Sequence, residues 1–160
     1  MSTAPTIGPV RAIVIGASAG GVEAIGTLLS ALPAALQVPV FIVLHLPRER
    51  PSLLAPIFQL RCALPVREAS DKEPVAPGTV YLAPPDYHLL IDEGPLTALS
   101  ADDPVHYSRP AIDVLFESAA DVYRAGLLGL VLTGYVPATA AGASLAIILM
   151  ATGIGQLISA

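Results

Sequence analysis

The chain has 160 residues, of which 54% are hydrophobic and 13% are charged, and its formal net charge at pH 7 is −5. A composition this apolar excludes a disordered chain, and this length predicts one domain with a substantial core. The negative net charge argues against a nucleic-acid partner, because no surplus of Lys and Arg is present to neutralise phosphates.

Strands and helices alternate in the first part of the chain. Residues 11–17 and 39–46 are short apolar runs, which are typical of strands buried on both faces of a parallel sheet. Each run is followed by apolar side chains at helical spacing, over residues 20–32 and 51–62. Residues 65–69 are a third predicted strand.

The middle of the chain changes to short strands separated by turns. Residues 79–83, 88–91 and 96–100 have the composition of strands, and the segments between them contain Pro-Pro-Asp and Asp-Glu-Gly turn signals. Their spacing predicts an antiparallel meander beside the parallel sheet. Residues 109–124 then form the clearest amphipathic helix, with acidic side chains on its outer face.

The last part of the chain is predicted as strand, helix and strand. Residues 127–132 are a buried strand, residues 138–151 a helix without a polar face, and residues 154–158 a final strand. The whole pattern predicts an α/β fold: a mostly parallel sheet with right-handed crossovers and a short antiparallel meander. Residues 1–10 are assigned to an N-terminal extension and residues 11–160 to one domain.

Three further features limit the class of protein. The one cysteine, Cys62, forms neither a disulfide framework nor a metal site by itself, and its apolar neighbours favour a buried position. Residues 1–9 lack the pattern of a signal peptide, so we expect a cytoplasmic protein. Residues 125–160 contain no charged side chain, but their longest apolar run is far shorter than the roughly 20 residues of a membrane span. We therefore expect a chain that is not embedded in a membrane.

A serine lies in the pattern Gly-x-Ser-x-Gly between the first predicted strand and helix. Ser18 has small neighbours on both sides, which a tight turn requires, and such a turn lifts the hydroxyl above the sheet edge. Backbone N–H groups at the start of the helix point to the same place and also bind anions, so a phosphate site is the alternative. The glycines do not form the Gly-x-Gly-x-x-Gly of a dinucleotide site.

A histidine stands at the carboxyl end of the second predicted strand. If this strand neighbours the first, His45 approaches Ser18 at the edge where parallel sheets carry their sites. A serine hydroxyl needs a base to take its proton, and an imidazole titrates near neutral pH. A structural histidine is the alternative, but the pair favours a serine hydrolase. His88 and His106 are weaker candidates for lining a cleft, and we expect both to be exposed.

Five segments resemble the catalytic domain of the chemotaxis protein-glutamate methylesterases, the CheB family. Residues 14–24 (VIGASAGGVEA) are similar to the opening of that domain, and residues 43–47 (VLHLP) to its histidine segment. Residues 78–90 (GTVYLAPPDYHLL) and 108–120 (SRPAIDVLFESAA) are similar to two signatures of the family. Residues 129–134 are similar to the strand before its acidic loop.

The resemblance implies a doubly wound sheet with a Ser-His-Asp triad. It also implies a hydrolase that removes γ-methyl esters from glutamates of chemoreceptors and, in some members, deamidates glutamines. By position, Ser18 would be the nucleophile, His45 the general base, and the backbone N–H groups of Ala19 and Tyr135 the oxyanion hole. No metal or organic cofactor is implied. The implied partners are methylated cytoplasmic receptor helices, with a receiver domain or a histidine-kinase pathway as a further link.

The chain departs from the family at the third triad position. Ala138 stands where the family has aspartate, in the segment after Gly134. This aspartate orients the histidine, and its loss in one serine protease lowers turnover by roughly 10⁴. Three explanations are open: a degenerate, slow or inactive relative, which could still act as a receptor-binding module; an acid supplied by Asp86, Asp102 or Asp103; or a sequence after Gly134 that departs from the native gene.

Overall fold

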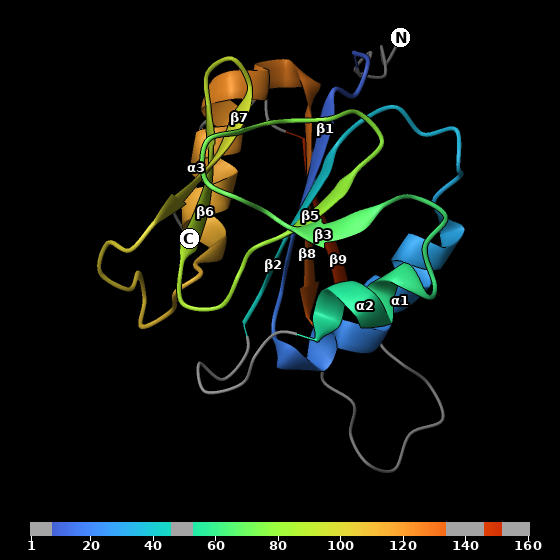
Figure 1. Cartoon of the computed structure of the whole chain (residues 1–160), viewed down its shortest axis with the longest axis horizontal. Coiled ribbons are helices and arrows are strands. Elements are labelled where there is room, and N and C mark those ends of the chain that lie inside the picture. Colours follow the sequence, from blue (N-terminus) through green and yellow to red (C-terminus); the bar gives the residue numbers. More distant parts are fainter. Residues whose placement is uncertain (1–7, 46–52, 134–145, 152–160) are drawn as a thin grey trace, which may run out of the picture.

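The computed structural model describes residues 8–45, 53–133 and 146–151 (Figure 1). The main sheet comprises β1 (Ala12–Ala17), β2 (Val40–Leu44), β3 (Val66–Glu68), β5 (Val80–Leu82), β8 (Leu127–Thr133) and β9 (Ala146–Ala151). Its strand order is β3-β5-β2-β1-β8-β9. Every neighbouring pair is parallel except β8 and β9, which are antiparallel. The predicted doubly wound, mostly parallel sheet is confirmed.

Helices cover both faces of this sheet (Figure 1). Two helices, α1 (Val22–Ala31) and α2 (Leu54–Gln59), pack on one face, and α3 (Ile112–Tyr123) packs on the other. Short 3-10 turns precede α1 (η1, Ala19–Gly21) and follow α3 (η2, Arg124–Gly126). Because both faces are covered, the central strands are apolar on both sides, which explains their continuous apolar runs.

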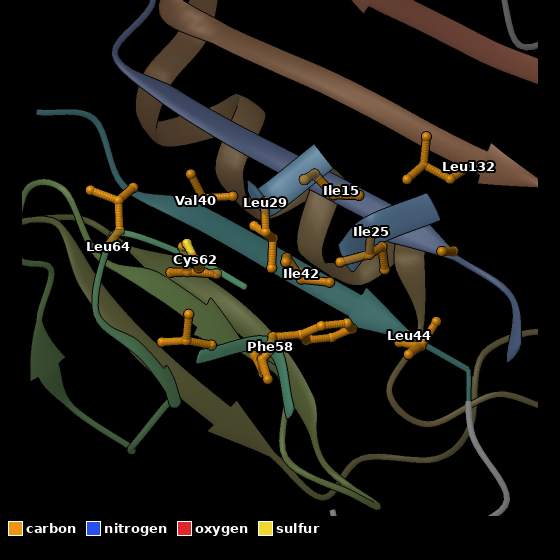
Figure 2. Close-up of a cluster of buried hydrophobic side chains, with 14 residues drawn as sticks. Ile15, Ile25, Leu29, Val40, Ile42, Leu44, Phe58, Cys62, Leu64 and Leu132 are labelled. Carbon is orange, nitrogen blue, oxygen red and sulfur yellow. The ribbon is translucent and has the colours of Figure 1, made fainter. Parts of the chain in front are cut away.

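The core under α1 and α2 is built from aliphatic side chains and one aromatic ring (Figure 2). Ile25 and Leu29 of α1 and Phe58 of α2 are almost completely buried against the sheet. Burial of each such side chain stabilises the fold by about 1.5–3 kcal/mol. Cys62 lies in the same cluster with 8% of its surface exposed, so the predicted buried position is confirmed.

The core under α3 contains more aromatic surface. The rings of Phe41 and Tyr81 stack with their centroids 5.4 Å apart, and the Arg11 guanidinium lies 5.7 Å from the Tyr123 ring centroid. Desolvation by burial raises the pKa of the Tyr123 hydroxyl above its usual value of 10.0, and the nearby positive charge of Arg11 opposes this shift. Leu115 of α3 completes this layer and is fully buried.

The second sheet is antiparallel, and its composition corrects one prediction. It comprises β4 (Glu73–Pro74), β7 (Leu96–Ser100) and β6 (His88–Asp92), in that order. Residues 79–83 were expected in this meander, but β5 lies in the main sheet, between β3 and β2. All three side chains of β5 are buried, so this strand is apolar on both faces and fits a covered parallel sheet better than a half-exposed meander.

The C-terminal part corrects a second prediction. A helix was expected over residues 138–151, but residues 146–151 form β9 and pair with β8 along their whole length. The expected helix had no polar face, and a short apolar run does not by itself distinguish a buried helix from a strand. Residues 138–145 and the predicted strand 154–158 lie outside the described residues. In the described part of the chain, no helix has the length and apolar composition of a membrane span.

The contact between β1 and α3 provides a test of this architecture. A Cβ atom added at Gly16 would lie 2.6 Å from Cγ2 of Ile112, so we expect Gly16→Ala to lower the free energy of unfolding by about 1–3 kcal/mol. Urea denaturation measures this change. Gly8→Ala is the control, because no atom lies within 4 Å of the added Cβ there. Equal stability of the two variants would contradict the close approach of α3 to β1.

Candidate active site

The Ser18 turn joins β1 directly to η1 and α1. Ser18 follows the last residue of β1 in an extended conformation (φ −80°, ψ 171°), and its side chain is exposed. The N–H of Gly21 donates to the carbonyl of Ser18 at 2.8 Å and closes the turn. The Ser18 side chain makes no capping hydrogen bond to the helix that follows. The hydroxyl is therefore exposed at the sheet edge and does not cap the helix.

His45 lies beside this turn. Ala17 and Leu44 are register partners in the parallel pair β1–β2, and the N–H of His45 donates to the carbonyl of Ala17 at 3.0 Å. Ser18 and His45 are thus each one residue beyond the same register pair, on strands that lie about 4.8 Å apart. The prediction that the second strand neighbours the first is confirmed.

The alternation of side chains predicts that both groups face the same side of the sheet. Ala17 and Leu44 point into the core under α1 and α2. In an extended backbone the next residue points to the opposite face. Ser18 and His45 are therefore both directed towards the α3 face by their position.

The imidazole of His45 is half-buried, and its Nε2 atom is inaccessible to solvent. This Nε2 has no hydrogen-bond partner among the described residues, Ser18 included. Most buried polar side-chain atoms have such a partner, whereas hydrogen bonds between catalytic groups are often long before substrate binds. A ring nitrogen that no described residue occupies can accept a proton, as a general base must.

The third strand end at this site belongs to β8. Leu132 is the register partner of Ala17 on the side of β1 away from β2, so Thr133 continues the sheet next to Ser18. The chain order also reverses here, since β2 and β8 lie on opposite sides of β1, and such switch points carry the ligand sites of parallel sheets. Tyr135 and Ala138, the predicted second oxyanion donor and third triad position, lie outside the described residues.

Asp86 is an acidic candidate at this edge of the sheet. It lies in the loop after β5, which is the neighbour of β2 on the side away from β1. Its Oδ1 accepts hydrogen bonds from Nε and Nη2 of Arg109 at 3.0 and 2.8 Å. Nη1 of Arg109 donates to the carbonyls of Ala101 and Asp102 at 3.0 and 3.1 Å. The contact between Asp86 and Arg109 therefore joins the β5–β6 loop to the loop between β7 and α3.

His88 is not exposed, contrary to the prediction. Only 1% of its surface is accessible, and the N–H of Ala111 donates to its Nδ1 at 3.2 Å. Nδ1 thus accepts, so the proton is assigned to Nε2, which lies 3.0 Å from the carbonyl oxygen of Asp103. His88 is a structural histidine that holds the start of α3. We call the contacts of Asp86 and His88 with Arg109 and Ala111 the 86–111 network.

The remaining candidates lie further along the loop before α3. His106 is exposed as predicted, and its Nε2 lies 3.4 Å from Oδ2 of Asp113 in the first turn of α3. Asp102 and Asp103 are exposed, and the hydrogen bonds described above use their backbone carbonyls. Arg109 was not singled out from the sequence, because an arginine before proline has no pattern of its own. Its partners lie up to 23 residues away.

The described residues at this edge of the sheet are suited to nucleophilic attack and proton transfer. Among them, no group of three or more His, Cys, Asp or Glu side chains is arranged to hold a metal ion. The hydroxyl, the imidazole and the N–H groups of η1 lie at one edge, where two covered strands end. This combination supports acyl transfer through a serine.

Comparison with known proteins gives a consistent result. The model of the CheB methylesterase family matches residues 13–147. A putative protein-glutamate methylesterase/protein-glutamine glutaminase of Leptospira interrogans is 44% identical over 124 residues, which cover 78% of this chain and 64% of that protein. A protein-glutamate methylesterase/protein-glutamine glutaminase of Dechloromonas aromatica is 43% identical over 127 residues, 78% of this chain and 36% of that protein. The chain thus spans only part of both relatives.

A solved structure is also similar. The CheB methylesterase catalytic domain of Thermotoga maritima has a TM-score of 0.74 and 32% sequence identity to this chain. The match covers 81% of this chain and 70% of that domain. The similarity therefore extends over most of the chain and is not limited to the segment around Ser18.

The 86–111 network can be tested through its arginine. We expect Arg109→Lys to lower the free energy of unfolding by about 1–3 kcal/mol, because a lysine cannot reach the carboxylate of Asp86 and two carbonyls together. Chemical denaturation gives this value. Arg61→Lys is the matched control, since Arg61 also lies 3.0 Å from a carboxylate, that of Glu23, but at the surface. A loss no larger than that of the control would contradict the role of Arg109.

Proposed function

The chain belongs to the CheB methylesterase family, and from this premise we propose that it is a serine hydrolase that removes methyl esters from glutamate residues of chemoreceptors. Residues 11–160 would form the catalytic domain. Its substrates would be the methylated cytoplasmic helices of the receptors, and it would act in the cytoplasm. Deamidation of receptor glutamines is the second reaction that the names of the relatives support.

One observation carries the proposal. Ser18 and His45 follow the register partners Ala17 and Leu44 at the ends of two adjacent parallel strands, and the alternation of side chains directs both to the α3 face. A hydroxyl and an imidazole in neighbouring positions supply a nucleophile and its base without further groups from the described residues. A phosphate site would need the N–H groups of η1 but gives no role to His45.

In the first half of the reaction, Ser18 Oγ attacks the carbonyl carbon of the glutamyl methyl ester while His45 takes the hydroxyl proton. The carbonyl oxygen becomes an oxyanion, which the N–H of Ala19 at the start of η1 and the N–H of Tyr135 would stabilise. When the tetrahedral intermediate collapses, the C–O bond to the methoxy group breaks. The methoxy oxygen takes the proton from His45 and leaves as methanol, and the glutamyl group remains esterified to Ser18.

In the second half, water replaces Ser18 at the acyl carbon. His45 removes a proton from the water as it attacks, and returns that proton to Ser18 Oγ when the acyl-enzyme bond breaks. The products are a glutamate carboxylate and the regenerated serine. His45 alternates between base and acid in both halves, so the protein group that stabilises imidazolium has a large effect on the rate.

Ala138 supports the alternative that the chain binds receptors with little or no turnover. An alanine cannot orient an imidazole or stabilise its charged form, and the remaining groups would give only residual catalysis. An active enzyme and a receptor-binding module would have the same fold and the same partner. A restored carboxylate would raise the rate of hydrolysis only in the enzyme.

Removing the hydroxyl tests the nucleophile. We expect Ser18→Ala to abolish labelling by a fluorophosphonate. We also expect it to lower the rate of methanol release from a methylated receptor fragment about 10²-fold. A larger loss is not expected, because a triad without its aspartate has already lost most of its rate. Ser30→Ala is the control. It removes a hydroxyl of α1 that donates a hydrogen bond to the carbonyl of Thr27. Full activity of Ser18→Ala would exclude the mechanism.

Restoring the carboxylate tests the third position. We expect Ala138→Asp to raise methanol release by about 10³–10⁴, since the aspartate orients the histidine and stabilises imidazolium. Ala140→Asp adds the same charge two residues further along the chain and is the control for a nonspecific effect of charge on the rate. A rate unchanged by Ala138→Asp, together with retained binding of the receptor fragment, would favour the binding module.

A further inference from the structure

A tight hairpin precedes α3 and carries two unusual residues at its tip. Val105 and Ser108 exchange two backbone hydrogen bonds, of 3.0 and 2.9 Å, and so enclose a two-residue turn. Both residues of this turn have positive φ angles, 48° at His106 and 64° at Tyr107. Turns of this kind normally contain Asn, Asp or Gly, because side chains with a bulky Cβ substituent are strained there.

The strain is not offset by packing of the tip residues. Tyr107 has 99% of its surface exposed, and the His106 side chain is 84% exposed. A large aromatic ring in full contact with water adds nothing to the core, and a glycine would fit the backbone better. Strained residues that packing does not explain are frequently found at binding sites. Tyrosine is also among the residues that contribute most to protein interfaces.

The base of the hairpin is held rigidly. Arg109, the residue after the hairpin, donates two hydrogen bonds to Asp86 of the β5–β6 loop and two to carbonyls of its own β7–α3 loop. The N–H of Ala111 is bound by the buried His88. Tyr87, with 45% of its surface exposed, lies between two residues of this network, Asp86 of the β5–β6 loop and His88 at the start of β6. The two exposed aromatic residues of the described chain are therefore carried by loops that the 86–111 network joins.

The tip lies close to the candidate active site. His106 of the tip contacts Asp113 in the first turn of α3. Ile112, the residue before Asp113, packs against Gly16, which lies two residues before Ser18. The hairpin is thus at the carboxyl edge of β1 and on the α3 face, the side to which Ser18 and His45 are directed. Five extended residues reach at most about 17 Å, which bounds the separation of Tyr107 from Ile112. A helix of 20 residues spans about 30 Å, so one substrate helix can reach both places.

We propose that the hairpin tip at residues 105–108 is a docking element for the protein substrate, and that Tyr107 packs against the helical segment next to the esterified glutamate. The inference rests on the proposed function, since it assigns the substrate contacts of the same site. Tyr107 acts in recognition and takes no part in proton transfer or attack. It therefore raises affinity for a helix and leaves the hydrolysis of a small ester unaffected.

Binding measured without turnover tests the docking element. In a Ser18→Ala background, we expect Tyr107→Ala to weaken binding of a methylated receptor fragment about tenfold by calorimetry, while Tyr107→Phe binds nearly as the parent does. Leu60→Ala is the control, because Leu60 is another exposed hydrophobic residue, 88% accessible, at the far end of α2. Equal affinity of Tyr107→Ala and the parent would overturn the inference.

Two further measurements separate this inference from the proposed function. With Ser18 intact, Tyr107→Ala is expected to hydrolyse 4-nitrophenyl acetate at the parental rate, and an equal loss on this ester and on the receptor would indicate a structural role instead. Tyr107→Gly is expected to raise Tm by about 2–4 °C, because it relieves the positive φ, and still to weaken binding. If the parent binds the receptor through Tyr107 but releases no methanol, the docking element stands and the esterase function fails.

Discussion

The candidate site depends on the parallel pairing of β1 with β2 on one side and with β8 on the other. This pairing brings three strand ends to one edge, and its register makes Ser18, His45 and Thr133 adjacent positions. Side chains alternate along a strand, so a slip of one residue in β2 would turn His45 to the opposite face. The apolar residues of both faces fix this register. The same slip would move Leu44 and Ile42 out of the core under α1 and α2 and onto the opposite face of the sheet.

The start of α3 is the second feature that shapes the edge. Ile112 occupies the space that a Cβ of residue 16 would need, so the helix can lie against β1 just before the Ser18 turn. The 86–111 network then fixes the loops on either side of this helix start through one arginine and one buried histidine. Two separated segments of the family resemblance, residues 78–90 and 108–120, are thus in physical contact with each other.

The chemistry of the site is determined by what surrounds the imidazole. His45 is half-buried with an unpaired Nε2, which suits a group that receives a proton and passes it on. A triad carboxylate next to the imidazole would orient the ring for this proton transfer. The carboxylate of Asp86 lies at the same edge but is bound by Arg109. Under the proposed function, the residue at position 138 would therefore affect the rate of hydrolysis.

The sequence by itself determined the fold class and most strands and helices, and it predicted Ser18 and His45 as candidate site residues. The signals for all of these are local: apolar periodicity, a glycine-flanked serine and a histidine after a buried strand. The sequence did not determine that β5 belongs to the main sheet, that residues 146–151 form a strand, or that His88 is buried. Each of these depends on partners far away in the chain. A short apolar run has the same local pattern in several environments, and a histidine is structural or exposed according to the groups that tertiary packing places beside it.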